Sequence, residues 1–227
     1  MVIVIPFIAI ILLVFGPQVW VRFTMKRFGG DRPDLQGTGG ELAQHLIERF
    51  ELEGVTVQKG GPGEDYYNPE DKLVSLSPEN YDGRSVTAVA VSTHEVGHAL
   101  QHKEQHPGFM LRQRRIKTAI TIERFSAIAL MISPVIFLIT RVPQSTLLTV
   151  AIGASGMLAA VWVQLVNLPV EMDASFKKAL PILEEGYLTE QDMHGARKVL
   201  KAAAWTYVAG AMASLLNLGR WIAILRR

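Results

Sequence analysis

Two histidines and a glutamate, His94, Glu95 and His98, form the motif HEVGH and offer the clearest chemistry in the sequence. If this segment is helical, residues four apart lie on one face, so His94 and His98 can bind one Zn²⁺ together. Glu95 then projects about 100° round the helix from His94, beside the metal but not bound to it. That position suits a general base for a water that the metal activates. Because zinc lowers the pKa of such a water to about 7, the motif predicts metal-assisted hydrolysis.

The residues before the motif favour a buried helix over a chance cluster of surface polar groups, which is the main alternative for so short a motif. Residues 85–91 (SVTAVAV) are small or apolar, and Ser85 can cap the start of a helix. A buried helix that carries two histidines and a glutamate needs a reason, because such groups are rarely buried without partners. We therefore interpret the segment as a zinc-binding helix.

The third metal ligand has to come from another part of the chain. The sequence has no cysteine, which excludes thiolate ligands and disulfide bonds. His102 lies two helical turns after His94, about 12 Å along the axis, and so cannot reach the same ion. A carboxylate is left, and the segment that follows a long apolar run holds two, Glu171 and Asp173.

Only one of these two carboxylates can face the metal, because positions 171 and 173 differ by about 200° on a helix that begins at Pro169. The longer side chain of Glu171 spans the gap between two helices more easily, so we predict a His₂Glu site with water as the fourth ligand. Gly97, which has no side chain, lets the second helix approach. Asp173 is then either a hydrogen-bond acceptor for a ligand or a surface carboxylate. In the alternative assignment, Asp173 is the ligand and Glu171 takes the outer role.

The composition is typical of a membrane protein, since 49% of the 227 residues are hydrophobic, 19% are charged and the mean hydropathy is +0.21. Residues 1–21 include a run of twenty uncharged residues, which is long enough to span a bilayer. Basic residues follow this run rather than precede it, so we interpret it as an uncleaved helix. Three further segments, 116–141, 145–168 and 202–224, complete a prediction of four transmembrane helices.

The segment 22–115 predicts a small α+β domain that carries the motif helix. Apolar residues at helical spacing indicate an amphipathic helix over 41–50. Residues 55–57 are typical of a strand, and 66–77 have the pattern of a β-hairpin. A strand beside a zinc helix can hold an extended peptide, or it can be plain scaffold, and the sequence leaves both readings open.

Four spans place segments 22–115 and 169–201 on one side of the membrane, as they must be if the motif helix and Glu171 are to meet. Segment 169–201 holds the helix of the glutamate ligand and a connector, and residues 189–192 resemble a capping box that starts the last helix. Basic residues flank the spans mainly on this side, so the positive-inside rule predicts a cytoplasmic site. Those on the side of the site are Arg22, Lys26, Arg27, Arg112, Arg114, Arg115, Lys177, Lys178, Arg197, Lys198 and Lys201, and those opposite are Arg141, Arg220, Arg226 and Arg227.

Three segments carry a likeness to one family: 92–101 (STHEVGHALQ), 167–175 (NLPVEMDAS) and 202–208 (AAAWTYV). Over nearly its whole length the chain resembles the YugP-like family of neutral zinc metallopeptidases, which are membrane proteins of bacteria. The resemblance implies a mainly α fold, a multi-span membrane helix bundle with a small α+β zincin-like cytoplasmic domain that carries the HExxH helix. It also implies a location in the bacterial inner membrane. More distant membrane peptidases carry an aspartate four residues after the ligand glutamate, where this chain has Ser175.

The function we expect is zinc-dependent hydrolysis of peptide bonds in membrane or membrane-adjacent proteins, with His94, His98 and Glu171 as ligands and Glu95 as general base and acid. The alternative is a non-catalytic, metal-bound membrane scaffold or binding module. The expected partners are the lipid bilayer and peptide or membrane-protein substrates. A net charge of +2 without a basic stripe gives no sign of a nucleic-acid partner.

Overall fold

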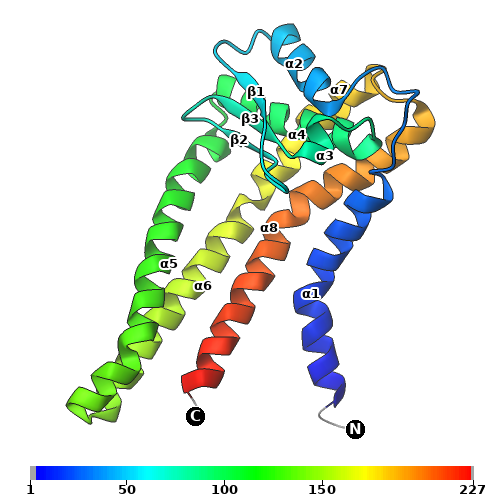
Figure 1. The fold of residues 1–227 in the computed structure, drawn as a ribbon. Helices are drawn as coiled ribbons and strands as arrows, with labels where there is room; N and C mark the ends of the chain where they lie inside the picture. Colours follow the sequence, from blue (N-terminus) through cyan, green and yellow to red (C-terminus); the bar gives the residue numbers. More distant parts are fainter. Residues whose placement is uncertain (1–3, 226–227) are drawn as a thin grey trace. The chain divides into compact units, whose positions relative to one another are not determined.

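The structure is a computed structural model that describes residues 4–225. The described chain is mainly helical and contains a three-stranded sheet (Figure 1). It divides into two compact units. The site unit comprises Val19–Met110 and Pro169–Thr206, and the apolar unit comprises Met1–Gln18, Leu111–Leu168 and Tyr207–Arg227.

Long helices run from one unit into the other, whereas the shorter elements belong to the site unit. The long helices are α1 (Val4–Arg27), α5 (Pro107–Thr140), α6 (Pro143–Asp173) and α8 (Glu190–Leu225). The shorter helices are α2 (Gly39–Arg49), α3 (Pro78–Tyr81), α4 (Val86–Lys103), the π-helix η1 (Ala174–Ala179) and α7 (Leu180–Glu184).

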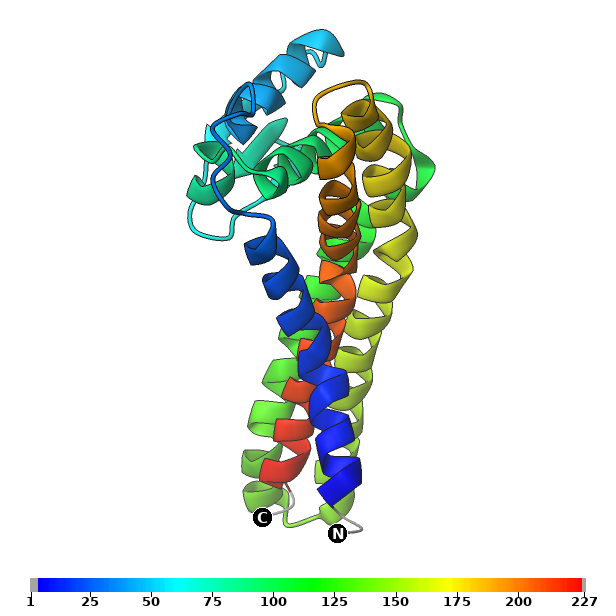
Figure 2. The ribbon, with the colours of Figure 1, turned by 90° about the vertical axis from the view of Figure 1, so that its right-hand side faces the viewer.

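In the apolar unit, α5 and α6 lie side by side and are packed closely through glycines (Figures 1 and 2). A Cβ atom built on Gly153 would lie 2.3 Å from Leu130 Cγ, and one built on Gly156 would lie 1.7 Å from Ser126 Oγ. Both distances are far below van der Waals contact, so any side chain at either glycine would force the helices apart. Small residues in this segment therefore serve close helix packing.

Two helical stretches among the described residues are long and apolar enough to cross a membrane, Pro107–Thr140 and Val150–Glu184. Large apolar side chains on them, among them Phe125, Ile139 and Trp162, are exposed. Apolar surface of this extent is what a lipid-facing helix presents. The spans expected at 1–21 and 202–224 remain predictions.

Helix boundaries differ from the predicted ones at two prolines. The second apolar helix begins at Pro107 instead of near residue 116, because proline is well suited to the first turn of a helix. Pro169 lies inside α6, which continues to Asp173, so the expected helix start at this residue is wrong. Proline removes one helical hydrogen bond, and here the helix continues past that loss. Pro181 lies in the first turn of α7. Figure 2 shows α6 leading through η1 into α7.

The sheet of the site unit consists of β1 (Thr56–Lys59), β2 (Tyr66–Asn68) and β3 (Leu73–Leu76) in the order β1-β3-β2. β2 and β3 are antiparallel, which confirms the predicted hairpin, and β1 pairs with β3 in parallel. Tyr67, Val74 and Leu76 are buried and belong to the same hydrophobic core as residues of α4. The sheet thus supplies part of the packing that fixes the motif helix.

Side-chain caps mark the starts of α2 and α8 in the site unit. Thr38 and Glu41 form a capping box at α2, in which each side chain accepts a hydrogen bond from the other residue's backbone N–H. At α8, Thr189 Oγ1 accepts a hydrogen bond from the backbone N–H of Asp192, so the predicted helix start at 189–192 is confirmed. Asp192 also pairs with Arg32, which ties the loop after α1 to this helix end.

Candidate metal centre

The motif residues lie in the middle of a helix that is buried on all sides. Ser85 caps α4 through a hydrogen bond of 3.0 Å from the backbone N–H of Ala88 to its Oγ, as the sequence predicted. Every residue from 86 to 99 is buried, and His94, Glu95 and His98 are only 3%, 7% and 3% exposed. Burying three such groups on one helix is costly unless they are partnered, so the structure has to provide partners.

A glycine lets the segment after Glu171 approach α4. A Cβ atom on Gly97 would lie 3.0 Å from the backbone oxygen of Ala174 and 3.3 Å from Lys178 Cβ, both in η1. A larger side chain at position 97 would therefore push η1 away. The expected role of Gly97 is confirmed by this close approach, which brings the segment after Glu171 against the motif helix.

His94, His98 and Glu171 come together in a buried cluster whose ligand atoms all lie within 4.8 Å of one another. Glu171 Oε2 lies 3.3 Å from the Nε2 atom of His94 and 3.3 Å from that of His98. The two imidazole rings are 4.7 Å apart, nearly perpendicular to each other, and Glu171 is 1% exposed. Two residues of the motif helix and one of α6 thus point their donor atoms at a common centre.

The spacing of these donor atoms fits a zinc ion. Zinc in proteins is tetrahedral with bonds of about 2.0–2.1 Å to histidine nitrogen, and such a tetrahedron holds neighbouring ligand atoms about 3.3–3.4 Å apart. The two distances of 3.3 Å from Glu171 Oε2 match that edge length. Two imidazoles and one carboxylate are also a donor set that catalytic zinc takes.

Glu95 is buried beside the cluster but contributes no atom to it. Burial raises the pKa of its carboxyl group, while the neighbouring His94 and His98 act in the opposite direction. The negative charges of Glu171 and Asp65 add to the increase, and the pKa is raised overall. A carboxylate whose pKa is raised takes up a proton more readily, which suits a group that must accept a proton and later return it.

Asp173 lies outside the cluster, so the geometry places Glu171 rather than Asp173 with the two histidines. Its Oδ2 atom accepts a hydrogen bond of 2.8 Å from the side-chain amide of Gln101. The oxygen of the same amide lies 2.9 Å from Nδ1 of His98. Asp173 is thus an acceptor one residue removed from a histidine of the cluster, which is one of the roles that the sequence left open.

Sequence reasoning did not assign roles to Gln101 and Ser175, which contact the two histidines. Ser175 Oγ lies 3.0 Å from His94 Nδ1, and Gln101 contacts His98 as described. Helical spacing could have indicated Gln101, because it lies three residues after His98 on the same helix, whereas the contact of Ser175 with His94 joins two separate segments. What spacing could not supply is which atom of each side chain meets the ring.

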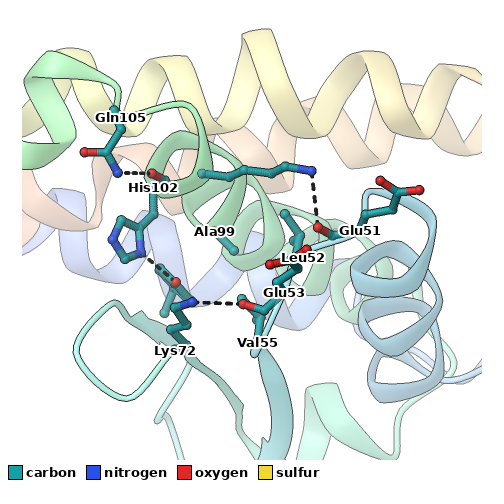
Figure 3. Close-up of a pocket in the computed structure, with 10 residues that line it drawn as sticks. Glu51, Leu52, Glu53, Val55, Lys72, Ala99, His102 and Gln105 are labelled. Carbon is teal, nitrogen blue, oxygen red and sulfur yellow. Dashed lines mark hydrogen bonds between the residues drawn. The ribbon is translucent and has the colours of Figure 1, made fainter.

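His102 faces a separate cavity of about 460 Å³, which Figure 3 shows. Its Nδ1 atom lies 2.9 Å from the hydroxyl of Tyr67, and it takes no part in the cluster. Lys72 and Lys103, which also line this cavity, donate hydrogen bonds to backbone oxygens of the loop before β1. The polar groups of the cavity are therefore engaged with one another, in agreement with the exclusion of His102 from the ligand set.

Comparison with known proteins shows which family the chain belongs to. Residues 2–226 match the model of the family described as "Putative neutral zinc metallopeptidase". The chain belongs to this family. It is also 34% identical over 223 residues to "Putative membrane protease YugP" of Bacillus subtilis (strain 168), and the match covers 96% of each chain. No solved structure matches the chain. The family and the buried donor set point independently to zinc.

Proposed function

We propose that the protein is a membrane-embedded zinc metallopeptidase that hydrolyses peptide bonds of membrane or membrane-adjacent proteins. The observation that carries the proposal is the buried set of His94, His98 and Glu171, with two donor distances of 3.3 Å. The zinc peptidase family of the whole chain supports the same reaction. A buried general base next to this set distinguishes it from a purely structural zinc site, which closes all four positions with protein ligands.

Each residue of the site has its own role in the proposed hydrolysis. His94, His98 and Glu171 would hold the zinc ion, which supplies a Lewis acid that polarises the scissile carbonyl and lowers the pKa of water. Glu95 takes one proton from the attacking water, whose oxygen bonds to the carbonyl carbon. As the carbon–nitrogen bond breaks, Glu95 returns this proton to the leaving amine. Its buried position keeps bulk water away from the proton during the transfer.

We place the enzyme in the bacterial inner membrane with its site facing the cytoplasm. The relative in Bacillus subtilis is named a membrane protease, and two stretches of this chain are long and apolar enough to cross a bilayer. The excess of basic residues in segments 22–115 and 169–201 supports the orientation. Substrates are then peptides and proteins that reach the membrane from the cytoplasmic side.

The test is the substitution Glu95→Gln in full-length protein purified in detergent. The variant keeps the size of the side chain but cannot take up a proton, so cleavage of casein-type peptides should fall at least about 100-fold, which is the lower range for general-base catalysis. Zinc content should stay at the level of the unmodified protein. Unchanged cleavage by the variant would contradict the mechanism, and no cleavage of any peptide by the zinc-loaded unmodified protein would favour the non-catalytic scaffold.

A further inference from the structure

We propose that Gln101 and Ser175 are positioning residues that fix the tautomer of both ligand histidines, so that each Nε2 atom presents a lone pair to the metal. The inference rests on the metal site of the proposed function and concerns the hydrogen bonds behind it. Gln101 and Ser175 are both fully buried in the site unit. Each contacts the Nδ1 atom of one histidine, on the side of the ring away from Glu171.

The orientation of the Gln101 amide follows from its surroundings. Its nitrogen lies 3.0 Å from the backbone oxygen of Val170 and 2.8 Å from Asp173 Oδ2. A backbone oxygen can only accept a hydrogen bond, so the NH₂ group belongs on this side and the amide oxygen faces His98. That oxygen lies 2.9 Å from His98 Nδ1 and is itself only an acceptor. His98 therefore carries its proton on Nδ1.

Ser175 imposes the same tautomer on His94. Its Oγ atom lies 3.0 Å from the backbone oxygen of Leu200 and 3.0 Å from His94 Nδ1. The hydroxyl has one proton, and it is donated to the backbone oxygen, because the opposite orientation would set two oxygen lone pairs against each other in a buried place. The hydroxyl oxygen then accepts from His94, whose proton is also on Nδ1.

Both histidines are thereby left with a lone pair on Nε2, 3.3 Å from a carboxylate oxygen of Glu171. With neutral rings, none of these three atoms carries a hydrogen, so they repel one another until a cation binds between them. A metal-free pairing of a neutral histidine ring with glutamate would instead need the ring's one proton on Nε2, which the contacts at Nδ1 disfavour. The hydrogen bonds at Nδ1 therefore leave the Nε2 atoms of both rings ready to bind a cation.

Zinc affinity is the measurement that tests this, made by chelator competition on full-length protein in detergent. Ser175→Ala and Gln101→Leu each remove the acceptor for one Nδ1 proton, and loss of such partners weakens metal binding by about 10–100-fold. The matched control is Ser92→Ala. Ser92 is a fully buried serine of α4, and its hydroxyl has no hydrogen-bond partner among the described residues. The control should bind zinc within about twofold of the unmodified protein, since no such partner is lost.

A paired substitution separates positioning from packing. Gln101→Glu combined with Asp173→Asn retains an acceptor for the Nδ1 proton of His98, and the introduced amide donates to the introduced carboxylate, but the backbone oxygen of Val170 loses its donor. We expect this double variant to recover part of the zinc affinity that Gln101→Leu loses. In metal-free protein labelled with ¹⁵N at histidine, both ligand rings should show the Nδ1–H tautomer by NMR, and Ser175→Ala should change that of one ring.

The outcomes are distinct from those of the proposed function. If the unmodified protein binds no zinc, the metal site fails and the inference fails with it. If it binds zinc but Ser175→Ala and Gln101→Leu bind as tightly as Ser92→Ala, the metal site stands and the positioning role is wrong. An Nε2–H tautomer at either ligand histidine of the metal-free protein, or no recovery in the double variant, would also overturn the inference.

Discussion

At the scale of single residues, the site combines groups that are costly to bury. Glu95 and Glu171 are both almost completely buried on neighbouring segments, and burial is the first cause of the raised pKa of Glu95. A carboxylate in such a place favours its neutral form, which opposes the charged form that a base needs. In the proposed function, the protein gives up stability at neutral pH in order to hold a base beside the metal, a trade-off that enzymes commonly make.

This trade-off predicts how the metal-free protein responds to pH. Because the pKa of Glu95 is raised on folding, its contribution to stability is fully present below the unfolded pKa and is lost as the pH rises through the folded pKa. Glu95→Gln removes this titration, so the Tm of the metal-free variant at pH 8 should exceed that of the unmodified protein. The difference should shrink as the pH is lowered toward 5. Thermal unfolding in detergent with a chelator measures both.

A control for this experiment is Glu53→Gln, which makes the same change at an exposed glutamate of a loop. It should shift the Tm little at any pH. A metal-free Glu95→Gln variant that is equally or less stable at pH 8 would show that burial of the carboxylate carries no cost.

At the scale of elements, the site depends on the contact between α4 and η1. The close approach of Gly97 to the backbone of Ala174 holds the two segments together. Glu171 precedes η1 and Ser175 lies within it, so a shift of this segment moves a proposed ligand and the partner of His94 together. A π-helix is rare and often occurs at functional sites, in agreement with its position here.

Gly97→Val tests the importance of this contact. The added side chain would have to displace backbone atoms of η1, so it should destabilise the protein by roughly 1–3 kcal/mol, as overpacking does. Zinc affinity should fall as well, because Glu171 is carried away from the histidines. Gly30→Val is the control, since a Cβ atom there meets no atom within 4 Å. Unchanged zinc affinity in Gly97→Val would mean that the position of η1 does not determine the site.

Much of the site was predictable from sequence because it follows the period of the α-helix. The spacing of His94 and His98, the Ser85 cap and the need for a small residue at Gly97 are all local signals. The opposed directions of Glu171 and Asp173 also agree with the structure, in which Glu171 meets the histidines and Asp173 meets Gln101.

What failed was the prediction of helix ends at prolines, together with roles that depend on tertiary contacts. Pro169 lies within a helix that continues past it. Proline costs a helix one backbone hydrogen bond, and the sequence alone does not show whether the helix ends there or continues despite that loss. The contact of Ser175 with His94 depends on how η1 packs on α4, and no periodicity in the sequence encodes that packing. The parallel pairing of β1 with β3 is equally a matter of tertiary structure.

At the scale of the whole molecule, segments of the site unit alternate along the sequence with segments that expose large apolar side chains. The site unit has a core built around α4, whereas stretches of α5 and α6 expose large apolar side chains. Both segments that make up the site unit are separated in sequence by α5 and most of α6. An even number of membrane crossings between them would keep both parts of the site on the same side.

The orientation can be measured with a reporter fused after Arg227. The basic residues beside the site exceed those opposite, so the site is predicted to be cytoplasmic. With four spans, both ends of the chain then lie on the outer side of the membrane. A reporter that is active only outside the cytoplasm, such as a periplasmic phosphatase, should therefore be active there. A fusion within the loop at residues 60–63 should be inactive with the same reporter. Activity in the reverse pattern would overturn the orientation.

The zinc content of purified variants tests the account most directly. The full-length protein, dialysed against metal-free buffer, should retain one zinc ion per chain in a His₂Glu site. Glu171→Ala should lose nearly all of it, and Asp173→Ala should keep more, because Asp173 lies outside the cluster and contacts Gln101 behind it. Both are compared at equal folded content, judged by circular dichroism. Full zinc retention in Glu171→Ala together with loss in Asp173→Ala would contradict the assignment of the site.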